Sequence, residues 1–179
     1  MRLLVLFLFL VASPVFAQKY VTEKGQTIFI SEAPLSSFEG VSKNLNGLID
    51  LDQNLLDFYL DLNTLETGIG LRDRHMRENY LETEQFPFAE FTGKLQLLPD
   101  LKLNAPVEVK AIGTFKIHGV EKEIEVFGTL TKVAENQVQL DASFEVLLSD
   151  YSIPLPKLVF YELAENQKVT LNAILTQKK

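Results

Sequence analysis

The stretch Pro106-Val-Glu-Val-Lys-Ala-Ile-Gly-Thr-Phe-Lys-Ile-His-Gly-Val-Glu-Lys-Glu-Ile-Glu-Val-Phe-Gly-Thr-Leu130 decides the fold. Apolar and polar residues alternate along it, which is the period of a β-strand with one dry face and one wet face. The segment His118–Val120 interrupts the alternation and predicts a tight turn between two antiparallel strands. The predicted inner face of this hairpin consists of Val107, Val109, Ala111, Gly113, Phe115, Ile117, Ile124, Val126, Gly128 and Leu130.

Three further segments alternate in the same way. Their predicted inner faces are Leu56, Phe58, Leu60 and Leu62; Val138, Leu140, Ala142, Phe144, Val146 and Leu148; and Val169, Leu171, Ala173 and Leu175. Long strands joined by short turns favour an up-and-down barrel, because closure removes exposed sheet edges. We therefore expect a mainly β protein with a closed antiparallel β-barrel of about eight strands, a size that can hold one small ligand.

A charged insert, residues 67–91, interrupts the strand pattern. Within it, Leu71, His75 and Met76 share one side of a predicted helix. A proline then breaks the helical period, and strands resume at Phe88. The insert therefore predicts one short helix between strands, which we expect to cap the barrel.

A second irregular segment, Ile153–Tyr161, carries two prolines and departs from a simple hairpin. We expect it to form a loop over the rim of the barrel mouth. Its predicted apolar contacts are Leu155, Leu158, Val159 and Phe160.

The N-terminus has the organisation of a secretory signal peptide. Arg2 precedes the apolar run Leu3–Val11, and small residues stand just before Gln18. Nine apolar residues are well short of the ~20 needed to span a bilayer, so we expect no stable membrane insertion. We predict cleavage after Ala17, a signal peptide over residues 1–17, one domain over residues 18–179 and a periplasmic location, with secretion outside the cell left open.

Composition narrows the classes of partner and chemistry. Cysteine is absent, which excludes disulfides and zinc-thiolate sites. Residues 18–179 contain sixteen Lys and Arg against twenty-four Asp and Glu, a net charge of −8. This charge repels phosphate backbones, so we expect no nucleic-acid partner, and it disfavours docking on anionic headgroups. Nothing in the sequence indicates an oligomeric state.

The two histidines lack the spacing of a metal or catalytic site. Asp73 and His75 lie two residues apart, which on a helix directs them to different sides, and His118 lies at a predicted turn. No nucleophile elbow, phosphate-binding or dinucleotide-binding pattern occurs. We therefore predict no catalytic residue, no metal and no cofactor, and we expect His75 to orient the helix against the barrel mouth.

Three arginines of the insert stand out in an acidic chain. We interpret Arg74 and Arg77 as partners in exposed ion pairs along the helix, with Asp73 and the nearby glutamates. For Arg72, two roles stay open: such an ion pair, or contact with the polar end of a ligand at the cavity entrance.

Small residues recur among the predicted inward positions. These are Ala111, Gly113, Gly128, Ala142 and Ala173. They permit either a channel through the barrel or a filled core in which Phe115 and Phe144 interdigitate. We expect an interior of Phe, Leu, Ile and Val to offer no buried polar partner, so its natural guest is hydrocarbon.

Two sequence blocks resemble the YceI-like family. The first is Arg72-Asp73-Arg74-His75-Met76 followed by Asn79-Tyr80-Leu81, Phe86-Pro87 and Ala89-Glu90-Phe91. The second is Gly113-Thr-Phe-Lys-Ile-His-Gly-Val120 followed by Glu121-Lys-Glu-Ile124, and Phe38-Glu39-Gly40 and Leu45-Asn46-Gly47 extend the resemblance over nearly the whole predicted mature chain.

The resemblance implies a lipocalin-like barrel that holds a long apolar molecule, typically a polyisoprenoid. It favours the channel over the filled core and a stoichiometric carrier or sequestering protein over an enzyme. The residues that we expect to contact the ligand are Phe58, Leu60, Arg72, His75, Ala111, Phe115, Val126, Ala142, Phe144 and Leu171.

Two alternatives stay open at this point. One is an enzyme that acts on an isoprenoid lipid with Asp73, His75 or Glu78 as acid or base. The other is a filled barrel that serves as a stress-related or redox accessory protein.

Overall fold

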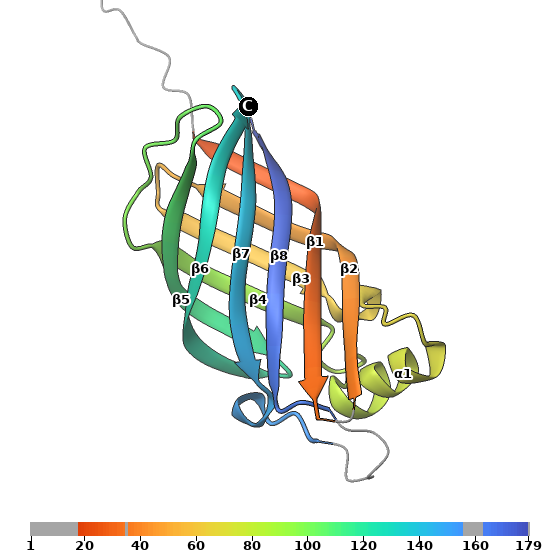
Figure 1. The fold of residues 1–179 in the computed structure, drawn as a ribbon. Coiled ribbons are helices and arrows are strands. Elements are labelled where there is room, and N and C mark those ends of the chain that lie inside the picture. The colour runs from red at the N-terminus through yellow and green to blue at the C-terminus, as the bar shows by residue number, and fades with distance from the viewer. Residues whose placement is uncertain (1–17, 35, 156–162, 179) are drawn as a thin grey trace, which may run out of the picture.

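Eight antiparallel strands close into a single barrel in sequence order, from β1 to β8 and back to β1 (Figure 1). The computed structural model describes residues 18–34, 36–155 and 163–178. The closed barrel of eight antiparallel strands confirms the predicted fold class. The strands are β1 (Lys19–Ala33), β2 (Ser36–Asp50), β3 (Leu55–Asp61), β4 (Phe88–Leu95), β5 (Pro106–Ile117), β6 (Val120–Ala134), β7 (Gln137–Leu147) and β8 (Asn166–Gln177).

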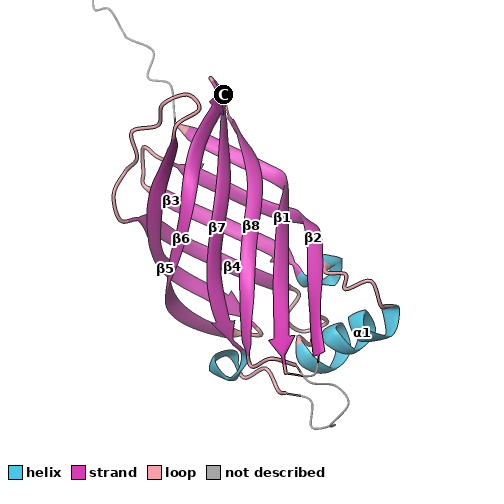
Figure 2. Cartoon of the chain, viewed as in Figure 1, coloured by secondary structure: helices cyan, strands magenta, loops and turns pink. Residues whose placement is uncertain are grey.

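The predicted helical insert lies between β3 and β4, beside one end of the barrel (Figure 2). It begins with a 3₁₀ turn, η1 (Leu62–Thr64), and continues as the α-helix α1 (Gly70–His75). One π-helical turn, η2 (Met76–Tyr80), follows α1 directly. A further 3₁₀ turn, η3 (Leu148–Tyr151), follows β7 at the same end.

The β5–β6 hairpin forms where the sequence predicts it. Residues 118 and 119 make the turn, with φ of 53° at His118 and 74° at Gly119. Positive φ at both central residues is the requirement of a type I′ turn, whose twist matches that of the flanking strands. The register then places Ile117 opposite Val120 and Pro106 opposite Thr131.

One end of the barrel is filled by its own side chains. Tyr20, Leu51, Val138 and Leu175 are all buried there, and Leu175 has no exposed surface. They lie where β1 and β7 begin and where β2 and β8 end, the upper end in Figure 1. The insert lies at the opposite end, so the barrel has one packed end and one end that the helices border.

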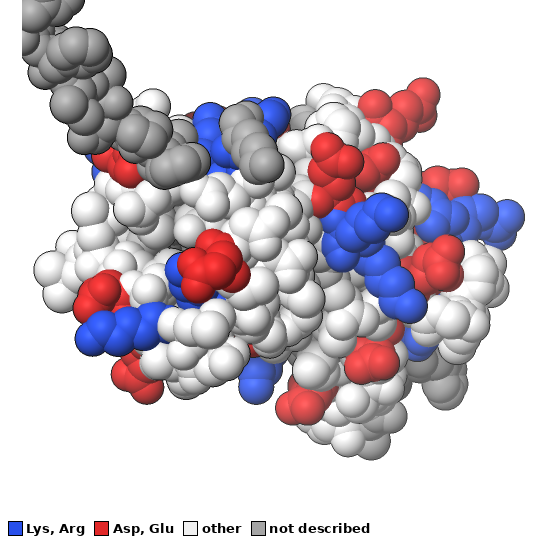
Figure 3. All heavy atoms as spheres, turned by 90° about the horizontal axis from the view of Figure 1, so that it is seen from above, with Lys and Arg blue, Asp and Glu red and all other residues white. Residues whose placement is uncertain are grey.

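The surface carries charges of both signs. Viewed from the packed end, blue and red side chains are interspersed over the visible face (Figure 3). Within the described residues, no helix is both long and apolar enough to cross a bilayer. The predicted signal peptide, residues 1–17, and most of the predicted rim loop, residues 156–161, lie outside the described residues.

Candidate ligand cavity

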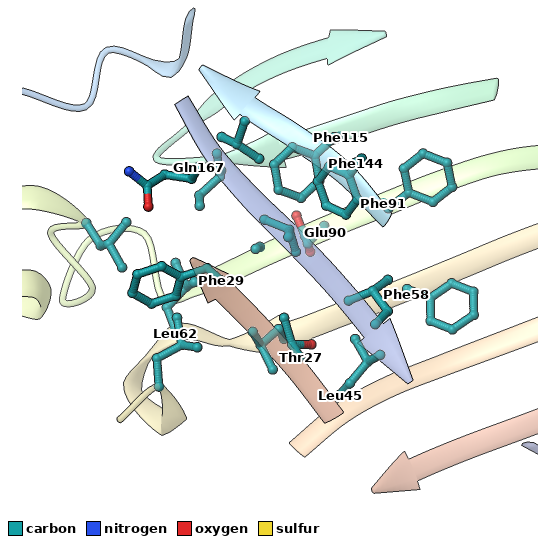
Figure 4. Close-up of a pocket in the computed structure, with 18 of the residues that line it drawn as sticks. Thr27, Phe29, Leu45, Phe58, Leu62, Glu90, Phe91, Phe115, Phe144 and Gln167 are labelled. Carbon is teal, nitrogen blue, oxygen red and sulfur yellow. The ribbon is translucent and has the colours of Figure 1, made fainter. Parts of the chain in front are cut away.

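The barrel encloses a cavity of about 730 Å³. This volume lies within the ~300–1,000 Å³ range of small-molecule pockets. All ten residues predicted to contact a ligand line it: Phe58, Leu60, Arg72, His75, Ala111, Phe115, Val126, Ala142, Phe144 and Leu171. Figure 4 shows Phe58, Phe115 and Phe144 among the aromatic side chains of its wall. The structure therefore brings these residues to one cavity, while their contact with a ligand stays a prediction.

Glycines opposite phenylalanines keep the middle of the barrel open. A Cβ atom at Gly40 would lie 2.0 Å from Phe29 Cε1, and one at Gly47 would lie 2.1 Å from Phe58 Cδ1. Each of these glycines is paired with its phenylalanine across neighbouring strands. The rings therefore fill the space that a side chain would take at the wall, instead of projecting farther into the cavity.

The small residues expected to form a channel have two different roles. Ala111, Gly128 and Ala142 line the cavity, as the channel interpretation requires. Gly113 does not, because the Phe91 ring covers it, with Cζ 2.9 Å from where a Cβ would lie. Ala173 does not line it either, because this buried residue packs against the backbone of β1 at Gly25.

The cavity opens beside α1. Ile69 and Leu71 both line it, yet 53% and 50% of their respective surfaces are exposed. The buried side chains of the packed end, Tyr20 and Leu175 among them, are not part of the lining. The mouth of the cavity therefore lies at the end that the insert borders, where the sequence predicts a capping helix.

Arg72 fixes the start of the insert at this mouth. Its Nε donates a hydrogen bond to Thr67 Oγ1 (2.8 Å), and its Nη2 donates to the Thr67 carbonyl oxygen (2.9 Å). Its guanidinium carbon lies 4.1 Å from the centroid of the Phe38 ring. Asp73 completes the anchor, because its Oδ1 accepts from Thr67 N (2.8 Å) and from Thr67 Oγ1. Of the two roles left open for Arg72, the ion pair is not formed, since Arg72 has none within 4.0 Å among the described residues.

The interpretation of Arg74 and Arg77 as ion-pair partners is wrong. Neither forms an ion pair within 4.0 Å among residues 18–34, 36–155 and 163–178. The acidic residues nearest in sequence have other roles, since Asp73 is buried and bound to Thr67, and Glu82 faces His118. Arg74 is exposed on the helix surface, and Arg77 is half-buried.

His118 joins three segments at the mouth. Its Nδ1 donates to the Tyr151 carbonyl oxygen (3.1 Å), and its Nε2 lies 3.2 Å from Glu82 Oε2. The Phe86 ring packs edge-on against it, with ring centroids 4.9 Å apart. The hairpin turn is thereby joined to η3 and to the end of the insert.

The three residues considered for an enzyme lie in different surroundings. Asp73 is buried and accepts from Thr67, His75 lines the cavity, and Glu78 is exposed outside the lining. No hydrogen bond joins any two of these three side chains in the described part of the chain. Nor do three or more His, Asp or Glu side chains gather there in a way that could hold a metal ion.

The expectation of an interior without polar partners is wrong. Thr27 and Gln167 both line the cavity, and both are buried, with 6% and 5% of their surfaces exposed. Thr27 Oγ1 and Gln167 Oε1 have no hydrogen-bond partner among the described residues. Most of the remaining lining is aliphatic or aromatic, and its other polar side chains include Ser36, Arg72, His75, Asn79 and Glu90.

Several lining residues were not predicted from the sequence. They come mainly from β1, β2 and β4 and from the insert, and they include Thr27, Phe29, Phe38, Leu45, Met76, Tyr80, Phe91 and Gln167. The alternation of Thr27, Phe29 and Ser31 is a signal that could have revealed the inner face of β1.

Comparisons with known proteins agree with this geometry. The model of the YceI-like domain matches residues 19–175. A polyisoprenoid-binding domain from Saccharophagus degradans, implicated in plant cell wall breakdown, has a similar structure, with a TM-score of 0.80, 18% identity and coverage of 90% of this chain and 99% of that one.

Two other solved structures share the fold. Burkholderia cenocepacia BcnA has a TM-score of 0.71 at 13% identity, with 85% of this chain and 96% of that chain covered. The Campylobacter jejuni YCEI protein has a TM-score of 0.68 at 19% identity, with 83% and 90% covered. No curated protein matches the sequence. Since the family model covers most of the chain, this protein belongs to the YceI-like domain family.

Proposed function

We propose that this protein binds a long-chain apolar lipid, a polyisoprenoid or a molecule of similar shape, and carries or sequesters it after export. The observation that carries the proposal is the cavity of about 730 Å³ with an almost wholly apolar lining and a mouth at one end. The related Saccharophagus degradans domain, which is described as polyisoprenoid-binding, supports the choice of ligand class.

Hydrocarbon burial is the main driving force of binding in this proposal. At about 30 Å³ for a water-sized group, the cavity holds on the order of 20 methylene-sized groups. Their burial gains on the order of 16 kcal/mol, at about 0.8 kcal/mol each, before the cost of lost translational and rotational freedom.

We assign a stoichiometric role rather than turnover. Asp73 is used in anchoring the insert, and the cavity wall offers few titratable side chains. A binding protein needs only the cavity and its mouth.

Export is the second part of the proposal. It is supported by the short apolar run Leu3–Val11 and by the small residues before Gln18. N-terminal sequencing of protein from the periplasmic fraction checks it. Protein that begins at Gln18 supports export, and protein found only in the cytoplasm with Met1 or Arg2 at its start contradicts it.

Native mass spectrometry tests the ligand directly. Protein purified without detergent from its own cells should carry an added mass that solvent extraction identifies as a prenyl lipid or a similar long-chain lipid. The matched control is the Ala142→Phe variant, which places a ring inside the cavity and should carry less lipid. Apo protein alone after gentle purification, together with no uptake of added prenyl lipids, contradicts the proposal.

A further inference from the structure

Two buried polar atoms of the cavity wall have no hydrogen-bond partner among the described residues: Thr27 Oγ1 and Gln167 Oε1. The residues that bear them are more than nine-tenths buried. An unsatisfied buried polar atom costs free energy, so such atoms in a folded protein call for an explanation. Both belong to the cavity lining, which makes a ligand group the natural partner.

The orientation of the Gln167 amide is fixed by its neighbours. Its Nε2 donates to the Ala164 carbonyl oxygen and to Ser31 Oγ (3.3 Å). A carbonyl oxygen only accepts, so the amide nitrogen must face Ala164 and the amide cannot be reversed. The atom left over is therefore the oxygen, an acceptor. In Figure 4 this oxygen points toward the part of the cavity where Phe29 lies.

The two unsatisfied atoms lie at different depths. Gln167 is paired with Ser31 on β1, and Ser31 is in turn paired with Phe38 on β2. The Arg72 guanidinium covers the ring of Phe38 at the mouth. Gln167 therefore lies near the mouth. Thr27 precedes Ser31 by four residues on β1, which corresponds to roughly 13 Å farther into the barrel.

We propose that the cavity selects a long-chain alcohol whose hydroxyl group donates a hydrogen bond to Gln167 Oε1, with its hydrocarbon tail extending past Thr27 toward the packed end. This inference rests on the proposed function and specifies its ligand class. The acceptor that lacks a donor in the protein matches the single donor of a hydroxyl group. A carboxylate, an ester or an ether has no donor to offer it.

The alcohol geranylgeraniol and its methyl ether test the inference, because they differ in the donor alone. Their affinities are measured on the purified, delipidated full chain by displacement of the neutral fluorescent hydrocarbon diphenylhexatriene. The wild-type protein should bind the alcohol about tenfold more tightly than the ether. The Gln167→Met variant should bind both equally, because it lacks the acceptor.

Thr27→Val is the matched control. It removes the other unsatisfied atom of the wall and keeps a side chain of the same shape, and it should leave the preference for the alcohol unchanged. Gln167→Met also loses the hydrogen bonds to Ala164 and Ser31 and could therefore fail to fold. In that case the ratio of the two affinities, alcohol to ether, still tests the inference in the wild-type protein and in Thr27→Val.

Three outcomes overturn the inference, and they are distinguishable. Equal binding of alcohol and ether by the wild-type protein overturns the donor requirement but leaves lipid binding intact. A preference that Thr27→Val abolishes places the hydroxyl group deep in the barrel and overturns the assignment to Gln167. Failure of both probes to displace diphenylhexatriene contradicts the proposed function as well.

Discussion

The Phe58 ring occupies the place that a side chain at Gly47 would take. Phe58 Cδ1 and Cε1 lie 2.1 and 2.2 Å from the position of a Cβ atom on Gly47, its partner across β2 and β3. Phe29 and Gly40 repeat the relationship between β1 and β2. The cavity therefore depends on glycine at positions where other residues would displace a ring into it.

The Gly47→Ala substitution tests this dependence. The added methyl group must displace the Phe58 ring, which should lower the free energy of unfolding by about 1–3 kcal/mol and reduce lipid uptake. Urea denaturation and lipid titration measure the two effects.

Gly70→Ala is the control for Gly47→Ala. No atom lies within 4 Å of where its Cβ would be, so it should be neutral or slightly stabilising at the start of α1. A Phe58→Leu change combined with Gly47→Ala should recover part of the lost stability, and strict additivity of the two changes would refute the steric coupling.

Ala142→Phe should block lipid binding without preventing folding. Ala142 is paired with Gly128, and both line the cavity, so a ring at residue 142 finds space above the glycine. We expect a loss of at least tenfold in affinity for a C20 prenyl alcohol, with thermal stability nearly unchanged. Ser143→Phe, at the neighbouring exposed residue, is the matched control and should bind like wild type. Equal loss in both variants would show that binding does not occur in the cavity.

Arg72 should contribute to stability where Arg74 does not. Arg72→Met removes two hydrogen bonds to Thr67 and the contact with the Phe38 ring, which we expect to cost about 1–3 kcal/mol. Arg72→Lys should recover little, because an ammonium group cannot replace the planar fork.

Arg74→Met should change stability by less than about 0.5 kcal/mol, as for an exposed side chain. Hydrogen exchange of residues 67–80 locates the effect. Equal protection of this segment in the Arg72→Met and wild-type proteins would contradict the anchoring role.

The phenol of Tyr151 should make stability fall at alkaline pH. Burial, and to a smaller degree the neighbouring Asp150 carboxylate, raise the pKa of Tyr151 above its ordinary value of 10.0. The unfolded chain therefore ionises at a lower pH than the folded one, so this contribution to stability is complete below about pH 10 and is lost as the pH rises through the folded pKa.

Urea denaturation of the wild type and of Tyr151→Phe across that pH range checks the effect. The wild type should lose stability more steeply than the variant. Parallel profiles for the two proteins would show that Tyr151 does not titrate differently in the folded and unfolded states.

The sequence predicts the inner faces of β5 to β8 because apolar residues occupy almost every second position in these strands. The same reasoning missed the inner face of β1, because Thr27 and Ser31 alternate there with Phe29 and weaken the apolar pattern. Their burial depends on neighbours far away in sequence. Ser31, for example, accepts hydrogen bonds from Ala164 N and Gln167 Nε2.

The candidate site was predictable in part for the same reason. Inward residues of alternating strands can be assigned to a shared interior, and the eight chosen strand residues line the cavity, together with Arg72 and His75 of α1. Whether any other small inward residue adds space to the cavity depends on strand pairing. Gly113 is small and inward, yet it adds no space because Phe91 of the neighbouring strand covers it. The isolated oxygen of Gln167 likewise becomes visible only once its amide nitrogen has found Ala164.

A crystal structure of the protein purified with its native lipid would show directly whether the barrel holds a lipid tail. We expect continuous, elongated electron density inside the barrel, beginning near Gln167 at the mouth and passing Thr27 toward the packed end. A barrel whose interior is filled by its own side chains from Leu71 to Leu175, with no space for a lipid tail, would contradict it.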